Sequence, residues 1–436
     1  MTTAIVESPA YGQNYLRFEN YTIGWICALP VEAECALYML DPETHRRLRT
    51  AIESIERDAQ MDDFHHFLQH LDSLQKRRNG HKFLYPGMDK DRFGEVEMDC
   101  LHSLVFQDML LRRQNIALDL LGACDWIFEN SELVQWRRQD DFKKHNGVLW
   151  IKGNPGAGKS TLMKHIWANC DKLFADCFIA TYFFNTRGHS LLEKTFLGML
   201  RSLLYQLLTT DDAVYQGFIT IFREKQKIYR RIEWHESELQ DFLFLEMRQY
   251  RSRRLLFIID ALDECTDSDR LKVVEFLESI SVNSGTNLWI CLSSRHYPNV
   301  TIKKRLEIVV ERSDEHRRGI AKYIKSKLKQ KSSEIQNRIL KKAAGIFMWV
   351  ILVVAKLNEA YDRGQVEVAD MRETLDQIPG DLEDLFQTLL NKDDGNKPEM
   401  MLMLQWVLYS MRPLKPEVLY FAVRFGTTAR NGKTRN

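Results

Sequence analysis

The fold of this chain is decided by the stretch Val148-Leu149-Trp150-Ile151-Lys152-Gly153-Asn154-Pro155-Gly156-Ala157-Gly158-Lys159-Ser160-Thr161. Its apolar beginning, residues 148–151, predicts a buried strand, and residues 161–168 have the spacing of a helix. Between the two, residues 153–160 match the complete pattern G-x-x-x-x-G-K-[ST] of the phosphate-binding P-loop. The alternative is a chance glycine turn, but such a turn does not require a strand before it and a helix after it. The stretch therefore predicts a nucleotide-binding site.

The chemistry of this loop follows from its expected geometry. Glycines allow the backbone to curl, so that successive N–H groups converge on one anion. The helix that begins beside the loop adds the positive end of its dipole at the same point. Lys159 is expected to reach the β- and γ-phosphates, and the Ser160 hydroxyl to bind Mg²⁺. The residues predicted to bind the nucleotide are Gly153, Asn154, Pro155, Gly156, Ala157, Gly158, Lys159, Ser160 and Thr161.

A second apolar strand ends in an aspartate. Five apolar residues, 255–259, precede Asp260, so the strand delivers a carboxylate at its C-terminal end, where ligands bind in open α/β sheets. Many strands end in aspartate, but one that lies roughly a hundred residues after a P-loop is the partner that the loop needs to hold Mg²⁺. We therefore predict that Asp260 is the metal-side carboxylate (the Walker B position) and acts through water.

Three more charged residues complete the predicted catalytic set. Asp263 and Glu264 continue the acidic cluster after Asp260, and either could orient the attacking water; the alternative is a simple solvated turn. The apolar strand at 287–295 ends in Arg295, which is placed to approach the γ-phosphate and report its presence. A plain surface arginine is the alternative for Arg295.

Composition sets wider limits. A length of 436 residues is enough for two or three domains, and the net charge of +1 gives no basic footprint for nucleic acid. The eight cysteines are scattered without a C-x-x-C pair, which indicates reduced thiols in the cytoplasm. No secretory signal opens the chain, and the most apolar run, 343–355, is shorter than the ~20 residues of a membrane span. We interpret this run as a buried core helix.

The pattern of the whole chain predicts an α/β fold, a parallel sheet flanked by helices. Further strands are expected at 177–184, 253–260, 287–295 and 308–310, with long helices at 191–207, 317–329, 333–354 and 371–377. We assign 147–312 to the P-loop NTPase core and 313–395 to a helical subdomain. Residues 396–436 look like the truncated start of a winged-helix subdomain.

The motifs in this order resemble those of fungal NACHT proteins, the NLR-like signal-transduction NTPases of the STAND class. The resemblance covers about 97–425 and rests on the P-loop, Asp-Ala-Leu-Asp-Glu at 260–264 and Ser-Ser-Arg at 293–295. Arg-Arg-Gln-Asn-Ile at 112–116 and the run at 345–350 also fit. It implies a switch role of the kind found in innate immunity and heterokaryon incompatibility.

Two segments before the core have weaker assignments. Residues 96–146 look like the helical lead-in to a NACHT domain, where by analogy 113–116 would cover the nucleotide base; simple packing is the alternative. Residues 21–41, in the N-terminal region 1–95, resemble the first strand and helix of a nucleoside-phosphorylase-like domain. The segment that follows is too short for the rest of such a domain, so we expect a remnant without phosphorylase chemistry.

The P-loop and Asp260 predict binding of Mg²⁺ with ATP or GTP, and the resemblance to NACHT proteins implies a nucleotide-gated switch that hydrolyses slowly and self-associates. Within the assigned core, 147–312, no Asn/Thr-Lys-x-Asp guanine motif is present, which favours ATP. A homo-oligomer or related NLR-like proteins are the expected partners, with no nucleic acid and no membrane span. The alternatives are a metabolic enzyme (a kinase or a nucleoside phosphorylase) and a truncated chain that only binds full-length relatives.

Overall fold

The computed structural model describes residues 94–423, with gaps at 117–121, 175, 189, 250–253, 298–300, 392–396, 410–418 and 421. The chain divides into two compact units, and the residues described between 94 and 389 belong to one of them. From the other unit, the helix α20 (Lys397–Tyr409) is described. The phosphorylase-like segment at 21–41, the helical pattern that follows it and the C-terminal tail lie outside the described residues.

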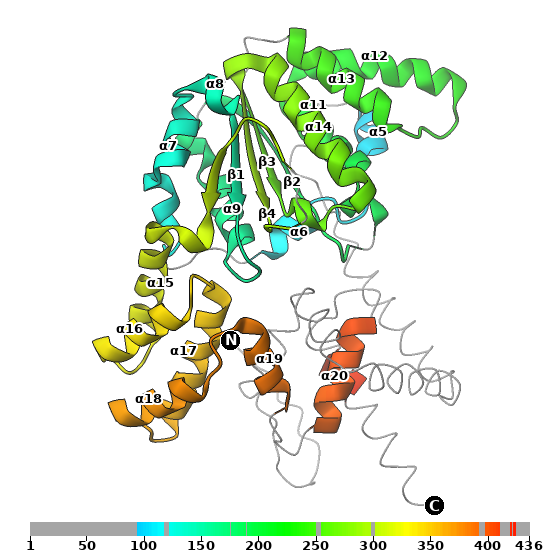
Figure 1. The fold of residues 1–436 in the computed structure, drawn as a ribbon. Coiled ribbons are helices and arrows are strands. Elements are labelled where there is room, and N and C mark those ends of the chain that lie inside the picture. The colour runs from blue at the N-terminus through cyan, green and yellow to red at the C-terminus, as the bar shows by residue number, and fades with distance from the viewer. Residues whose placement is uncertain are drawn as a thin grey trace, which may run out of the picture. The chain divides into compact units, whose positions relative to one another are not determined.

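The centre of the larger unit is a five-stranded parallel sheet with the strand order β2-β3-β4-β1-β5 (Figure 1). This confirms the predicted fold class. The registers align Lys152 with Ser294 and Phe183 with Asp260, so these strands end at one edge of the sheet. The strands are β1 (Val148–Lys152), β2 (Cys177–Phe183), β3 (Arg254–Asp260), β4 (Leu288–Ser294) and β5 (Leu306–Val309).

Helices surround the sheet and continue beyond it. The segment before β1 forms α5 (Glu95–Leu104), α6 (Leu111–Asn115), η2 (Asp125–Glu129), α7 (Ser131–Arg138) and α8 (Phe142–His145). Between the strands lie α9 (Lys159–Ala168), α10 (Cys170–Leu173), η3 (Leu191–Lys194), α11 (Phe196–Thr210), α12 (Asp212–Ile228), α13 (Glu236–Gln249), η4 (Leu262–Glu264), α14 (Asp267–Ser284) and η5 (Gly285–Asn287). After β5 follow η6 (Val310–Arg312), α15 (Asp314–Lys327), α16 (Ser333–Lys342), α17 (Phe347–Asp362), α18 (Val368–Gln377) and α19 (Leu382–Asn391).

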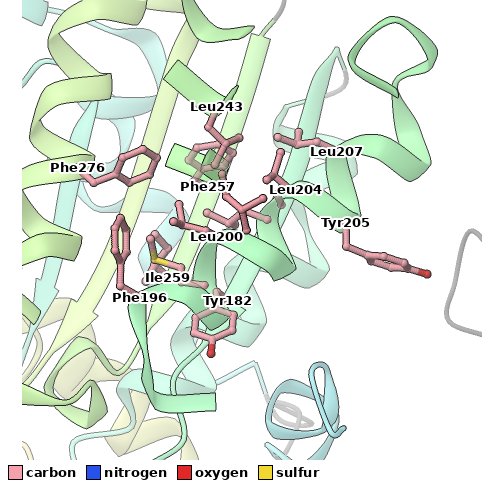
Figure 2. Close-up of a cluster of buried hydrophobic side chains, with 14 of the residues drawn as sticks. Tyr182, Phe196, Leu200, Leu204, Tyr205, Leu207, Leu243, Phe257, Ile259 and Phe276 are labelled. Atoms are coloured by element: carbon pink, nitrogen blue, oxygen red, sulfur yellow. The ribbon is translucent and has the colours of Figure 1, made fainter. Parts of the chain in front are cut away.

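The sheet separates two apolar cores, because successive side chains of a strand point to opposite faces. Tyr182, Phe257 and Ile259 are buried on one face, where they meet side chains of α11, α13 and α14 (Figure 2). Leu149 and Ile258 are buried on the other face, with residues of α7 and α9. Both faces of the central strands are therefore covered, which explains why β1, β3 and β4 are apolar without alternation.

The helix expected at 191–207 is divided in two. Residues 191–194 form the short η3, and α11 begins only at Phe196. The Ser190 side chain caps η3 and the Thr195 side chain caps α11 by accepting from the Gly198 N–H. Any Cβ at Gly198 would lie 1.7 Å from the Leu192 carbonyl oxygen, so the turn requires glycine there. The spacing of apolar residues does not reveal the two N-caps, so the break between η3 and α11 was not predicted.

The prediction of one helix over 333–354 was wrong. The chain instead forms α16 and α17, and the break lies at Ala344 and Gly345, which both have positive φ angles of 47° and 83°. The apolar run thus begins α17, whose Trp349, Val350 and Val353 are buried. Within the described ranges, no helix is both long and apolar enough to span a membrane.

We expect Gly345→Ala to destabilise the protein more than a positive φ angle alone explains. A Cβ at Gly345 would lie 2.7 Å from Glu311 Cα and 2.8 Å from its carbonyl oxygen. Gly364 is the matched control, because its φ is 97° but nothing lies within 4 Å of its Cβ position. Strain at such a φ costs about 1–3 kcal/mol. The Tm of Gly345→Ala should therefore fall clearly below that of Gly364→Ala; equal values would contradict the close approach.

Candidate functional site

The P-loop connects the end of β1 to the beginning of α9, as the sequence predicts. Gly156 and Gly158 have φ angles of 75° and 95°, the left-handed region that favours glycine. Ala157 lies between them and is fully buried, which fixes the loop to the core. Gly158 occupies the N-cap of α9, so the free N–H groups of the first turn belong to Lys159 and the residues after it. The loop therefore has the backbone form of an anion site.

Lys159 lies back across the loop. Its Nζ donates to the carbonyl oxygens of Gly153 (2.8 Å) and Asn154 (3.0 Å). Burial lowers the pKa of Lys159, while the carboxylates of Asp263 and Asp260 act in the opposite direction. The predicted phosphate-binding cation and the predicted acidic residues are thus close enough to interact.

Asp260 ends β3 with its side chain fully buried. Its Oδ1 accepts from the hydroxyl of Ser293 on β4, and the Ser160 hydroxyl is near enough to lower the pKa of Asp260. Burial raises the pKa of Asp260, and the two serine hydroxyls oppose this shift. Its Oδ2 has no hydrogen-bond partner among the described residues.

This arrangement fits Mg²⁺, which takes oxygen ligands and often needs only one or two from the protein, with phosphate and water supplying the rest. A buried carboxylate oxygen without a partner costs free energy unless a cation or a donor satisfies it. The serine of the P-loop lies beside that carboxylate, so Ser160 and Asp260, the predicted metal residues, come together.

Asp263 and Arg295 form an ion pair at the same edge of the sheet. Arg295 Nε lies 3.0 Å from Asp263 Oδ2, and the Arg295 backbone N–H donates to Asp263 Oδ1 at 3.0 Å. The carboxylate thus holds both the side chain and the backbone of the residue that follows β4. The sequence predicted a role for each residue, but only the fold shows that the two are partners.

Glu264 has different partners. Its Oε1 lies 3.3 Å from Nη2 of Arg112 in α6, and its Oε2 accepts from the backbone N–H of Thr186 at 3.1 Å. Burial raises the pKa of Glu264, and the Arg112 cation acts against this shift. The two acidic residues after Asp260 are therefore held by different segments, Asp263 by β4 and Glu264 by α6 and the end of β2.

Arg270, for which the sequence predicted no role, holds the loop at 262–265 through its backbone carbonyls. Its guanidinium donates to the carbonyl oxygens of Leu262 (3.4 Å), Asp263 (3.2 Å) and Cys265 (2.7 Å). An arginine in the first turns of α14 has no sequence feature that marks it as a partner of three carbonyls. Ser293, by contrast, lies in the Ser-Ser-Arg motif that drew attention to Arg295.

Glu311 was also missed, and it links the loop to the residue after Arg295. Its Oε2 accepts from the Asn154 N–H at 3.2 Å, and its Oε1 lies 2.5 Å from Nε2 of His296. The beginning of α17 reaches the loop as well, because the Met348 N–H donates to the Gly156 carbonyl at 2.9 Å. The loop therefore contacts the helices after the sheet through backbone atoms.

The lead-in segment around α6 packs against β2 and α9. Arg113 donates to Thr181 Oγ1 at 2.5 Å, and its guanidinium lies 4.1 Å from the centre of the Trp167 ring. Burial lowers the pKa of Arg113 to about 10. Lys164 of α9 donates to the carbonyl oxygens of Gln114 (3.0 Å) and Ile116. These contacts fix the segment beside the P-loop helix; a contact with the nucleotide base stays a prediction.

We expect Asp260→Asn to raise the Tm of the protein in EDTA at neutral pH. Because burial raises the pKa of Asp260 in the folded state, the charged carboxylate costs stability, and this cost appears as the pH rises through the folded pKa. The neutral amide removes it, a change on the order of 1 kcal/mol, or about 2–4 °C. The gain should vanish at a pH below the ordinary aspartate value. A lower Tm in EDTA would contradict this account.

Known proteins similar to this chain were found by sequence and by structure. A family model described as nephrocystin 3, N-terminal, matches residues 122–295. The vegetative incompatibility protein HET-E-1 of Podospora anserina is 24% identical over 284 residues, which are 61% of this chain and 20% of that protein. The matched segment thus spans about a fifth of that relative's length. Among solved structures, Cdc6p from Pyrobaculum aerophilum is 11% identical, with a TM-score of 0.33 over 74% of this chain and 83% of that one.

The family model spans the P-loop, the strand that ends in Asp260 and the strand that leads to Arg295. These are the motifs on which the resemblance to NACHT proteins rests. With the matching incompatibility protein and the parallel sheet, they confirm that resemblance. The chain is therefore similar to NACHT proteins, and its described part has a parallel α/β sheet with a P-loop after β1.

Proposed function

We propose that the protein is a signal-transduction switch that binds a nucleoside triphosphate with Mg²⁺, hydrolyses it slowly and self-associates in the triphosphate state. The observation that carries the proposal is the position of Asp260. Its buried Oδ2 has no hydrogen-bond partner in the described part of the chain, and the carboxylate lies near the P-loop residues Ser160 and Lys159. A structural carboxylate would have both oxygens satisfied by the protein.

Each residue has a defined task in this proposal. The loop amides and Lys159 bind the β- and γ-phosphates, in place of the two carbonyls that Lys159 contacts in this structure. Ser160 and Asp260 hold Mg²⁺, which neutralises the charge on the phosphates. Arg295, fixed by Asp263, approaches the γ-phosphate. ATP is favoured over GTP because the core, 147–312, contains no Asn/Thr-Lys-x-Asp guanine motif.

Hydrolysis requires an oriented water, and Glu264 is our choice for that residue. Water attacks the terminal phosphorus, the bond to the bridging oxygen breaks, and the diphosphate leaves with that electron pair. The proton of the water passes to a carboxylate. Asp263 is the rival, and its two oxygens contact the Nε and the backbone N–H of Arg295. The switch role itself is supported by the similarity to an incompatibility protein.

Lys159→Ala should abolish tight nucleotide binding. The change removes the cation that faces the β- and γ-phosphates, and charge-assisted contacts of this kind contribute about 1.5–3 kcal/mol each, or roughly tenfold to a hundredfold in Kd. Titration with a fluorescent ATP analogue in Mg²⁺ measures the effect. Lys164→Ala is a control, because its Nζ contacts lead-in carbonyls instead of the loop. Unchanged affinity in Lys159→Ala would overturn the P-loop assignment.

The same variant tests self-association. If the triphosphate state assembles, Mg·ATP should raise the mass of the wild-type protein in solution, measured by light scattering. Lys159→Ala should then keep the mass of the nucleotide-free protein. Equal masses of the wild-type protein with and without nucleotide would contradict the assembly step while leaving the binding step intact.

Glu264→Gln should slow phosphate release by about 10²–10⁴-fold while binding is retained, because an amide does not accept the proton. Asp263→Asn should instead weaken the coupling to Arg295 and affect release less. Both variants are measured with ATP as the sole substrate, so that release needs no acceptor and a kinase reaction is distinguished. If only Asp263→Asn slows release, the roles of the two carboxylates are exchanged.

A further inference from the structure

The lead-in helix α6 reaches the candidate catalytic centre through one side chain. Arg112 Nη2 lies 3.3 Å from Glu264 Oε1, although the two residues are 152 positions apart in the chain. Only 21% of the Arg112 side chain and 15% of the Glu264 side chain are exposed, so the ion pair is largely shielded from water. Arg112 Nε is buried without a hydrogen-bond partner among the described residues. The guanidinium thus contacts the Glu264 carboxylate through Nη2 and leaves Nε without a protein acceptor in the described part of the chain.

The neighbouring arginine of the same helix does something else. Arg113 bonds to Thr181 on β2 and lies over the Trp167 ring, so it attaches the segment to the sheet and to α9. The two adjacent arginines thus separate two tasks: Arg113 fastens α6, and Arg112 is directed at Glu264. This difference gives each residue a natural control in the other.

A buried carboxylate needs a partner to remain ionised and fixed. Three donors contact the Glu264 carboxylate: the Arg112 guanidinium at Oε1, and the amide and the hydroxyl of Thr186 at Oε2. A carboxylate with both oxygens placed in this way has one orientation, and Oε1, with one donor among the described residues, keeps an accepting lone pair for water. Solvent screens the attraction in such a pair less than in a surface pair, and removal of one partner leaves the other charge shielded from water without compensation.

We propose that Arg112 is a positioning residue for nucleotide hydrolysis, which keeps Glu264 charged and oriented toward the attacking water. The inference rests on the proposed function of Glu264 and deepens it. Electrostatics support it: burial raises the pKa of Glu264, and the positive charge of Arg112 is the largest effect that lowers this pKa. Asp260 and Asp263 also face Glu264 and raise its pKa, so Arg112 is the cation that offsets them.

The test compares phosphate release by the full chain carrying Arg112→Ala, Arg112→Lys or Arg113→Ala with that of the wild-type protein. Complete loss of a general base costs about 10²–10⁴-fold, so loss of its positioning cation should lower kcat by roughly tenfold, with KM little changed. Arg112→Lys should restore part of the rate, because only one nitrogen contacts Glu264. Arg113→Ala should lower the Tm and, if its segment covers the base, raise KM, but it should not show the tenfold fall in kcat.

A double-mutant cycle with Glu264→Gln makes the test specific. If Arg112 acts through Glu264, Arg112→Ala should change the rate by less than about twofold in the Glu264→Gln background. An equal loss in both backgrounds would show that Arg112 acts elsewhere, for instance on Asp260, whose pKa it also lowers. If kcat falls equally in Arg112→Ala and Arg113→Ala, the lead-in segment has only a structural role and the inference is wrong.

Failure of the inference and failure of the proposed function give different results. An Arg112→Ala variant with the wild-type kcat, where Glu264→Gln is slow, would overturn the inference alone. Absence of nucleotide binding or of phosphate release by the wild-type protein would overturn the proposed function, and the inference with it. Fluorescent-nucleotide titration of each variant establishes which of these applies.

Discussion

The structure depends on a buried carboxylate at the end of a buried strand. Asp260 is fully enclosed, and its position is fixed by the parallel register of β2, β3 and β4 and by the hydroxyl of Ser293. A charge is costly to bury, so such a residue has to be compensated by hydrogen bonds or by a cation. The P-loop lies where Ser160 can supply a hydrogen bond.

Around this carboxylate, each neighbouring anion has a partner from a distant part of the chain. Asp263 pairs with Arg295 after β4, Glu264 with Arg112 of the lead-in, and Glu311 with His296. These contacts connect the P-loop edge to four separate segments. A change in one partner can therefore alter the site without a large movement of the sheet, which is the property that a nucleotide-dependent switch requires.

The helical region after the sheet is connected to the loop by backbone contacts. The break at Ala344 and Gly345 places the beginning of α17 beside the P-loop, where Met348 donates to Gly156. His316 of α15 contacts the Gly345 carbonyl at 2.9 Å and so supports the same turn. A continuous helix over this region would carry the chain past the loop, so the positive φ angles are a condition for the contact.

The sequence by itself determined the parallel α/β sheet, the P-loop and the strand that ends in Asp260, because apolar runs, glycine spacing and strand-terminal carboxylates are local signals. Only the tertiary structure decided the partners: Arg112 with Glu264, Arg270 with the loop carbonyls, and Glu311 with Asn154. An ion pair between residues that are far apart in the chain leaves no local pattern in the sequence from which it could be predicted. The break before α17 was not predicted for a related reason. It is required by the close approach of Gly345 to Glu311, and the periodicity of apolar residues contains no information about such an approach.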